Sequence, residues 1–159
     1  MKKFFKYLLS LFLLFTIVSC GTVKNDTNNN NNEQQEELTV VTKEFEGTSY
    51  TVYKNQPYNT KYEVAIYIHY YHELPKNYYT KSESKEHSFS KEWTKENKMS
   101  IGGDHFGNRE GRLPSGVSYT ECDINSVRTS RGAERIVFSD TFIVYYTPDH
   151  YKTFEEIIF

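Results

Sequence analysis

Two carboxylates and three arginines lie close together in the last third of the sequence. Glu121 and Asp123 are two residues apart in an alternating segment, so on a β-strand both would lie on one face. Neighbouring carboxylates repel each other and require cations nearby, which Arg128, Arg131 and Arg135 can supply. One interpretation is a structural salt-bridge network. The other is a phosphate-binding site in which arginine side chains hold the phosphate and a carboxylate acts as a base.

His150 is the candidate proton donor for the same chemistry. It lies in the turn before the last predicted strand, where a side chain can project over a sheet, although a solvated loop histidine is the alternative. A base, an acid and guanidinium groups meeting at one point would support phosphoryl chemistry without a metal. The sequence has no cluster of metal ligands at typical spacing, no P-loop and no Gly-x-Ser-x-Gly motif. Cys122, on the strand face opposite Glu121, is expected to pack in the core.

The elements predicted to position these groups are helices followed by strands. Apolar residues at helical spacing behind a capping box predict a helix over 60–72, and a second capping box predicts a shorter helix with Lys81 in its first turn. Five glycines within 101–118 predict a loop. Period-two segments predict strands over 120–125, 135–138, 142–146 and 151–158. This order predicts an α+β fold in which N-terminal helices pack on a C-terminal antiparallel β-sheet.

The first 37 residues are predicted to lie outside this fold. Residues 1–19 combine three lysines with an apolar run over 7–18, as in a secretory signal peptide that is too short to span a bilayer. Residues 17–20 resemble a bacterial lipobox, so Cys20 is expected to carry a lipid. Residues 20–37 are polar and Asn-rich, which predicts a solvated tether. We therefore predict an exported lipoprotein on the extracellular side of the cell membrane.

Composition favours a single aromatic-rich domain after the tether. Residues 38–57 are rich in β-formers and predict an N-terminal extension that forms a short hairpin or a pair of edge strands, and residues 58–159 contain the remaining elements. The 14 Tyr and 11 Phe favour a sheet over a helical bundle. The net charge is -2, and removing the three signal lysines lowers the 19 cations to 16 against 21 anions, so a polyanionic partner would need a local basic patch. With Cys20 lipidated, Cys122 has no partner for a disulfide.

Five blocks of the sequence resemble one known family. They are residues 71–83, residues 100–114, residues 121–125, the pair Arg131 and Arg135, and residues 147–154, and they occur in the family's order. The family is the barnase and binase family of bacterial guanyl-specific ribonucleases, and the resemblance runs from about residue 60 to residue 157. It implies the microbial ribonuclease fold. Residues 38–57 lie outside the resemblance, and between residues 89 and 100 the chain is several residues shorter than barnase.

The resemblance implies a role for each matching residue. Glu121 is implied as the general base and His150 as the general acid. The cations implied around the scissile phosphate are Lys81, Arg131 and Arg135. The residues implied to bind the guanine base are Phe106, Asn108, Arg109, Glu110 and Tyr151. Two further carboxylates are implied to give structural support, Asp104 within a loop and Asp123 beside the arginines.

The reaction implied by the resemblance is cleavage of single-stranded RNA after guanosine, without a metal or other cofactor. Glu121 would take the proton of the ribose 2′-OH as that oxygen attacks phosphorus, and His150 would protonate the departing 5′-oxygen. The product would be a 2′,3′-cyclic phosphate, which is hydrolysed in a second step. The Glu110 carboxylate could accept hydrogen bonds from N1–H and N2–H of guanine, a pair of donors that adenine lacks.

The expected partners follow from the same features. They are guanine-containing single-stranded RNA, the membrane through the lipid on Cys20, and an inhibitor protein like barstar, with the protein itself a monomer. The alternative function is a catalytically weak surface lipoprotein that keeps the fold and binds nucleotides or a protein. The presence of both Glu121 and His150 favours turnover, since a binding module would have no need for both. A toxin domain delivered to competitors is a third hypothesis, which the short lipidated tether disfavours.

Overall fold

The computed structural model describes residues 39–87 and 89–159. The predicted signal peptide, Cys20 and most of the tether lie outside these residues and stay predictions. The elements occur in the order β1 (Val40–Phe45), β2 (Thr48–Tyr53), α1 (Lys61–Tyr71), β3 (Tyr78–Tyr79), the 3-10 turn η1 (Glu83–Lys85), α2 (Phe89–Glu92), β4 (Ser100–Phe106), β5 (Tyr119–Asp123), β6 (Arg135–Ser139), β7 (Val144–Thr147) and β8 (Glu155–Ile157). Within the described residues, none of the helices has the length and apolar character needed to cross a bilayer.

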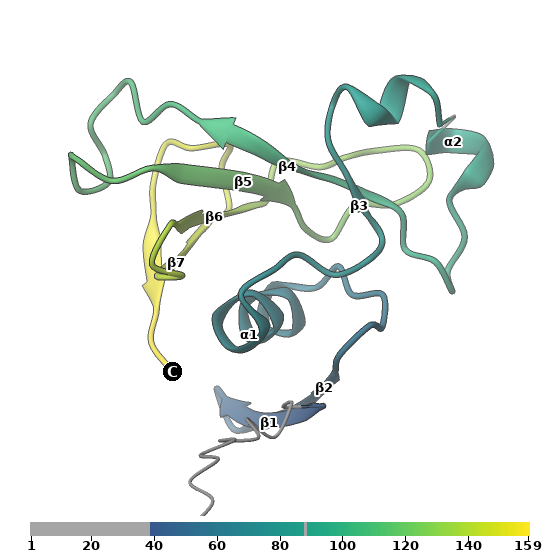
Figure 1. The fold of residues 1–159 in the computed structure, drawn as a ribbon, viewed down its shortest axis with the longest axis horizontal. Helices are drawn as coiled ribbons and strands as arrows, with labels where there is room; N and C mark the ends of the chain where they lie inside the picture. The colour runs from purple at the N-terminus through teal and green to yellow at the C-terminus, as the bar shows by residue number, and fades with distance from the viewer. Residues whose placement is uncertain (1–38, 88) are drawn as a thin grey trace, which may run out of the picture. The chain divides into compact units, whose positions relative to one another are not determined.

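The main sheet confirms the predicted α+β fold. Its six strands follow the order of the chain, from β3 to β8, and every neighbouring pair is antiparallel except β3 with β4. Helix α1 lies against one face of this sheet (Figure 1). The other face carries a second apolar cluster, whose buried members are Leu113, Tyr119, Val137 and Tyr145. Residues on β5 and β6 alternate between these two faces. Consecutive side chains therefore point to opposite faces, one toward α1 and the next toward the second cluster.

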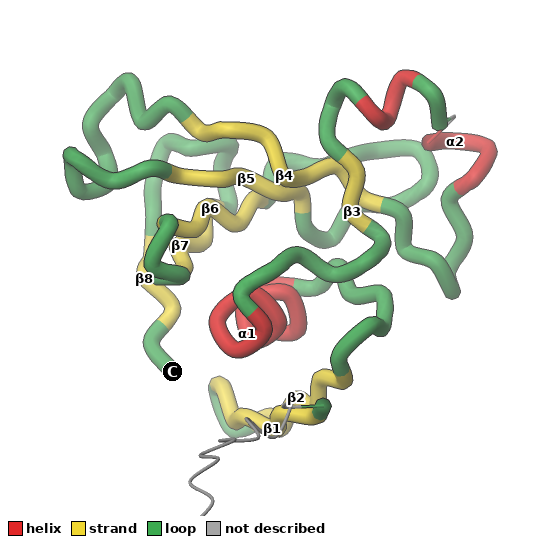
Figure 2. Tube along the Cα trace, in the orientation of Figure 1, coloured by secondary structure: helices red, strands yellow, loops and turns green. Residues whose placement is uncertain are grey.

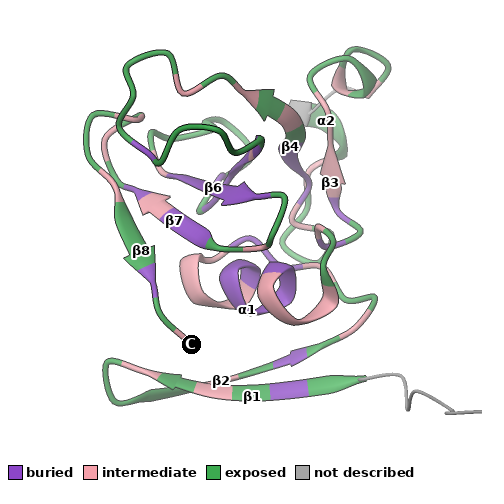
Figure 3. Ribbon diagram, turned by 60° about the vertical axis from the view of Figure 1, so that its left-hand side comes forward, coloured by how far each residue is buried: buried purple, intermediate pink, exposed green. Residues whose placement is uncertain are grey.

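Helix α1 lies between the sheet and the N-terminal hairpin. Five consecutive residues of the helix, Val64–Ile68, are buried, and a helix that is apolar on all sides must be covered on all sides. The sheet covers one side, while β1 and β2 cover the other with Val41 and Val52 (Figures 1 and 3). The helix ends at Tyr71, because His72 adopts a left-handed conformation with φ 59°. The predicted hairpin and first helix are thus both confirmed.

Two sequence predictions about local structure are wrong. The second predicted helix is only the turn η1 and the four-residue helix α2, so one helix rather than several packs on the sheet (Figure 2). The glycine-rich region 101–118 was expected to be a loop throughout, yet its first part is strand β4. Gly102 is required inside this strand because a Cβ there would lie 2.4 Å from Cys122 Cβ. Glycine therefore marks a close approach of β5 here rather than a turn.

The last predicted strand, over 151–158, is also shorter than expected. Only Glu155–Ile157 pairs with β7, and residues 148–153 form bends. Asp149 explains the difference, because its carboxylate accepts hydrogen bonds from backbone N–H groups that a strand would direct to its neighbour.

Candidate active site

Strand β5 lies between β4 and β6, and it places Glu121 on the face of the sheet that carries the second apolar cluster, opposite α1. The residue is only 9% exposed, and its neighbours across the strands are Asp104 and Val137. Its carboxylate oxygen Oε1 lies 2.5 Å from Nζ of Lys81. The ion pair joins a nearly buried carboxylate to an ammonium group that is half exposed. The ion pair therefore holds the Glu121 carboxylate in place, and its exposed lysine partner leaves the pair accessible from solvent.

Lys81 is positioned through its backbone as well as its side chain. Thr80 and Glu83 form the predicted capping box, in which Thr80 N donates to Glu83 Oε2 at 2.8 Å and Glu83 N donates to Thr80 Oγ1 at 3.2 Å. The box closes the turn η1 instead of a long helix. Asp104 Oδ2 accepts a hydrogen bond from Lys81 N at 2.9 Å. Asp104 therefore ties the segment that carries Lys81 to strand β4.

Asp123 is the second acidic residue of β5, and it binds two arginines. It accepts two hydrogen bonds from Arg131, from Nε at 2.5 Å and from Nη2 at 2.9 Å. Arg135 Nε lies 2.8 Å from Asp123 Oδ1, within ion-pair distance but poorly directed for a hydrogen bond. The hydrogen bonds that Arg131 donates to the Asp123 carboxylate raise the pKa of Arg131. The salt-bridge network expected as the conservative interpretation therefore exists, and it also fixes two guanidinium groups beside Glu121.

Arg135 is held by more than its carboxylate partner. Its Nη1 donates to the carbonyl oxygens of Gly132 at 3.1 Å and Glu134 at 2.7 Å, and its side chain is only 5% exposed. Arg131, by contrast, is 42% exposed. One guanidinium is thus fixed in the floor of the site, and the other reaches solvent.

His150 and Tyr151 come from the bends between β7 and β8. Both adopt left-handed conformations, with φ 57° and φ 72°, which residues other than glycine rarely do. His150 N donates to the carbonyl oxygen of Ala133 at 3.1 Å, so the bend is tied to the loop before β6. The centroids of the His150 and Tyr151 rings lie 4.6 Å apart. Burial, and then the hydrogen bond between the Tyr151 hydroxyl and the Glu121 carboxylate, raise the pKa of Tyr151.

Four of the five predicted base-binding residues, all except Tyr151, lie at the end of β4 and in the loop that follows. The Phe106 ring lies 5.1 Å from the Tyr151 ring, so the two aromatic residues expected to contact a base are neighbours. Asn108 Nδ2 donates to the Leu113 carbonyl at 2.8 Å, and Asn108 Oδ1 accepts from Leu113 N at 3.1 Å. Asn108 thus shapes the loop. Arg109 and Glu110 are exposed at its tip.

The structure brings most of the predicted residues to one face of the sheet. The set that it joins by direct contacts consists of Lys81, Asp104, Glu121, Asp123, Arg131, Arg135, His150, Tyr151 and Phe106. Sequence reasoning missed Asp149, whose hydrogen bonds organise the bend around His150. The signal was a carboxylate followed four residues later by a threonine. In the part of the chain that the structure describes, no group of three metal-binding side chains is arranged around a common point.

Comparison with known proteins identifies the class to which this fold and site belong. A family model described as ribonuclease matches residues 64–158. A ribonuclease of Heyndrickxia coagulans is 47% identical over 107 residues, which cover 62% of this chain and 96% of that protein. Ribonucleases of Bacillus intermedius and Bacillus pumilus are also 47% identical over 107 residues, but the match spans only 65% of their length. The chain belongs to this ribonuclease family, which confirms the resemblance to barnase and binase.

Solved structures of ribonuclease Sa2 are also similar in sequence. The complex of that enzyme with guanosine-2′-cyclophosphate is 42% identical, with a TM-score of 0.31, and the match covers 33% of this chain and 59% of that one. The hairpin β1–β2 lies before the residues matched by the family model.

Proposed function

We propose that the protein is a metal-independent endoribonuclease that cleaves single-stranded RNA after guanosine. The observation that carries this proposal is the contact of Glu121 with Lys81 and Tyr151 beside the arginines held by Asp123. This arrangement offers a proton acceptor next to fixed positive charge, which is what in-line attack on a phosphodiester requires. Family membership supports the general activity.

In the proposed first step, Glu121 removes the proton from the ribose 2′-OH. The freed oxygen attacks the adjacent phosphorus, the bond from phosphorus to the 5′-oxygen breaks, and His150 gives its proton to that leaving oxygen. Arg131, Arg135 and Lys81 stabilise the negative charge that develops on the phosphoryl oxygens. In the second step, His150 activates water and Glu121 returns the proton as the cyclic phosphate opens. DNA lacks the attacking hydroxyl and is not cleaved.

Guanine selection is assigned to the loop after β4. The exposed Glu110 carboxylate can accept from N1–H and N2–H of guanine, while loop backbone N–H groups donate to O6. Phe106 and Tyr151 lie side by side and offer rings for stacking on the base. Adenine presents the opposite donors and acceptors, so it would leave the Glu110 carboxylate without partners.

The test is cleavage of a panel of dinucleotides that differ in the 5′ base. We expect cleavage of guanosine dinucleotides with a cyclic phosphate product, in the presence of EDTA. Glu121→Gln and His150→Ala should each lower the rate by about 10²-fold or more, the usual effect of losing a general base or acid. His105→Ala is the matched control, because this exposed histidine lies on β4 outside the contacts described above.

Two outcomes would contradict the proposal. A strict requirement for a divalent ion would exclude the mechanism, and equal cleavage after all four bases would exclude guanine selection. Retention of guanosine nucleotides without any cleavage would instead favour the alternative function, a binding lipoprotein.

Attachment to the membrane through Cys20, and control by an inhibitor protein like barstar, are separate proposals. They rest on the lipobox-like residues 17–20 and on the family resemblance.

A further inference from the structure

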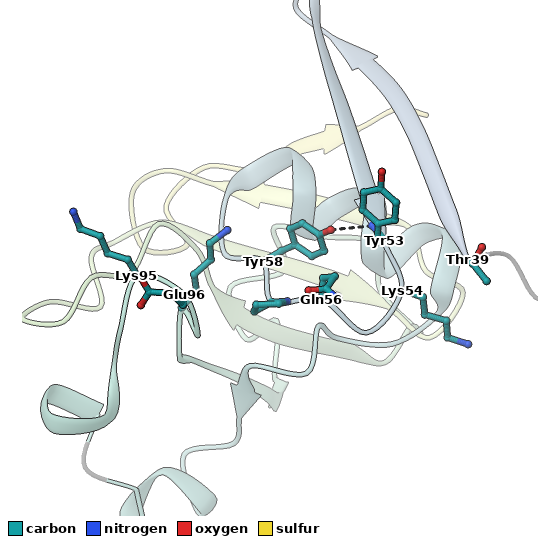
Figure 4. A pocket seen from close by; sticks show the side chains of 9 residues that line it. Thr39, Tyr53, Lys54, Gln56, Tyr58, Lys95 and Glu96 are labelled. Carbon is teal, nitrogen blue, oxygen red and sulfur yellow. Dashed lines mark hydrogen bonds between the residues drawn. The ribbon is translucent and has the colours of Figure 1, made fainter.

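A hollow of about 620 Å³ lies between the end of the hairpin and the turn that precedes β4 (Figure 4). Its lining includes two tyrosines, Tyr53 and Tyr58, and three lysines, Lys54, Lys95 and Lys98. None of the residues assigned to cleavage or base recognition lines it. Its first wall comes from the segment before the family match, and its second wall from the turn that carries Lys95 and Lys98. The hollow is therefore built in part from a segment that lies outside the family match.

The hollow is locally basic in a chain with a net charge of -2. Its one carboxylate is Glu96, whose pKa is lowered by hydrogen bonds from its own backbone and from Thr94, so this group is engaged by the turn that carries it. Among the described residues, neither Lys95 nor Lys98 forms an ion pair with a carboxylate. Positive charge concentrated in this way attracts an anion.

The aromatic part of the hollow is firmly held. The Tyr58 hydroxyl accepts a hydrogen bond from Tyr53 N at 2.9 Å, and Asn77 bonds both the N–H and the carbonyl of Tyr58. Asn77 also donates to the Lys98 carbonyl at 2.7 Å, and Lys98 Nζ lies 5.6 Å from the centre of the Tyr58 ring. The Tyr53 side chain is 53% exposed. The ammonium group of Lys98 thus lies over a buried ring, beside a second ring that is open to solvent.

A second hollow, of about 260 Å³, continues this surface. It shares Lys95 and Lys98 with the first, and it adds Trp93, Asn125 and Val127. Trp93 Nε1 is buried and has no hydrogen-bond partner within the described residues. Asn125 and Val127 belong to the same connection between β5 and β6 that carries Arg131. The two hollows together therefore extend from the hairpin to the loop that supplies a cation to the candidate active site.

We propose that these hollows bind a segment of single-stranded RNA outside the cleavage site. The lysines contact successive phosphates, and the exposed ring of Tyr53 stacks on a base. Cations that follow a strand, interleaved with aromatic rings, are the chemistry by which proteins hold single-stranded nucleic acid. The inference rests on the proposed ribonuclease function for the identity of the ligand. It gives the hairpin β1–β2 a role, because that element supplies Tyr53 and leads into Lys54 and Tyr58.

The test compares long and short ligands for the full chain. The probes are a fluorescent single-stranded DNA of about 15 nucleotides, which the proposed chemistry cannot cleave, an RNA of the same length, and a guanosine dinucleotide. The variant combines Lys95→Gln with Lys98→Gln. The control combines Lys43→Gln with Lys91→Gln, which removes the same charge from lysines that line neither hollow.

We expect the Lys95 and Lys98 variant to bind the long DNA about tenfold more weakly at low salt. The salt slope, which is the slope of log K against log salt concentration, should become shallower by about 0.7 for each phosphate contact removed. It should raise KM for the long RNA and leave dinucleotide cleavage unchanged, because a dinucleotide does not reach the hollows. Tyr53→Ala should weaken binding by about fivefold or more through the lost stacking.

Affinity and salt slope equal to those of the control variant would overturn the proposal. Equal losses on the dinucleotide and on the long RNA would also overturn it, since they would indicate a general effect on the enzyme. If wild type cleaves no dinucleotide but the DNA affinities still differ as expected, the proposed ribonuclease function fails while the binding site stands.

Discussion

Both carboxylate oxygens of Asp149 bind Thr153. Oδ1 accepts from the Thr153 backbone N–H at 2.9 Å, and Oδ2 accepts from the Thr153 hydroxyl at 2.8 Å. The same carboxylate accepts from Lys152 N and from the Thr147 hydroxyl. These bonds close the bend in which His150 adopts a left-handed conformation. Asp149 therefore compensates for the strained backbone of the candidate general acid.

The first prediction concerns the pH dependence that follows from Asp149. Hydrogen bonds, above all from the Thr153 backbone, lower its pKa from 3.8 to about 2. A lowered folded pKa contributes stability that is present above the unfolded value and is lost as pH falls through the folded one. Wild type should therefore be more stable than Asp149→Asn near pH 6, and the difference in free energy of unfolding should shrink between pH 3.8 and pH 2. Denaturant unfolding at several pH values measures this, and a constant difference would contradict it.

The second prediction concerns Asp123, the shared partner of two arginines. Asp123→Asn should destabilise the protein by about 3 kcal/mol, because removing one partner of a buried ion pair leaves the other charge uncompensated. Arg135 is the buried partner and should account for most of the loss, since Arg131 can turn to solvent. Urea unfolding gives the value. Asp140→Asn, at an exposed position, is the control, and an equal effect of the two substitutions would refute the argument.

The third prediction tests the close packing of β4 on β5. Gly102→Ala should cost about 1–3 kcal/mol or more, since the added methyl would overlap atoms of Cys122 and Tyr78 that cannot easily move away. Gly107→Ala is the matched substitution, because its new methyl would meet nothing closer than 3.6 Å. Thermal unfolding of the two variants should therefore differ clearly. Similar melting temperatures would show that β4 can shift away from β5.

The fourth prediction concerns attachment to the membrane. The apolar run over 7–18 followed by Cys20 predicts that the full chain fractionates with membranes and incorporates labelled lipid. Cys20→Ala should abolish the labelling and release the protein or change its processing. Cys122→Ala is the control, as it removes the buried thiol and leaves Cys20 in place. Lipid labelling that persists in Cys20→Ala would show that the anchor lies elsewhere.

The sequence was most informative where one local pattern determined the structure. The alternation around Glu121 and Asp123 was sufficient to place both carboxylates on one face of β5, and helical spacing behind Thr60 was sufficient to define α1. The assignment of individual roles came from the family resemblance, since spacing alone also fitted a structural salt-bridge network.

Predictions failed where distant segments determine the local conformation. Gly102 looked like a loop residue because its reason for being glycine is β5, which lies about 20 residues further along the chain. The second capping box does form, but the sequence after it lacks an apolar stripe, so only one turn follows. The bend around His150 depends on side-chain bonds from Asp149, which compete with strand pairing.

The irregular pairing of β4 with β5 restricts which insertions and deletions β4 can accept. Gly102 faces Cys122 and Asp104 faces Glu121, so Gly103 is an extra residue that has no partner on β5. Deleting one residue here would bring the next side chains onto the wrong faces, and Asp104 would no longer reach the Lys81 backbone. Residues 107–118 form a loop and can change in length without that effect. Relatives that gain or lose residues should therefore do so after Phe106, and the spacing from Ser100 to Phe106 should stay fixed wherever the enzyme stays active.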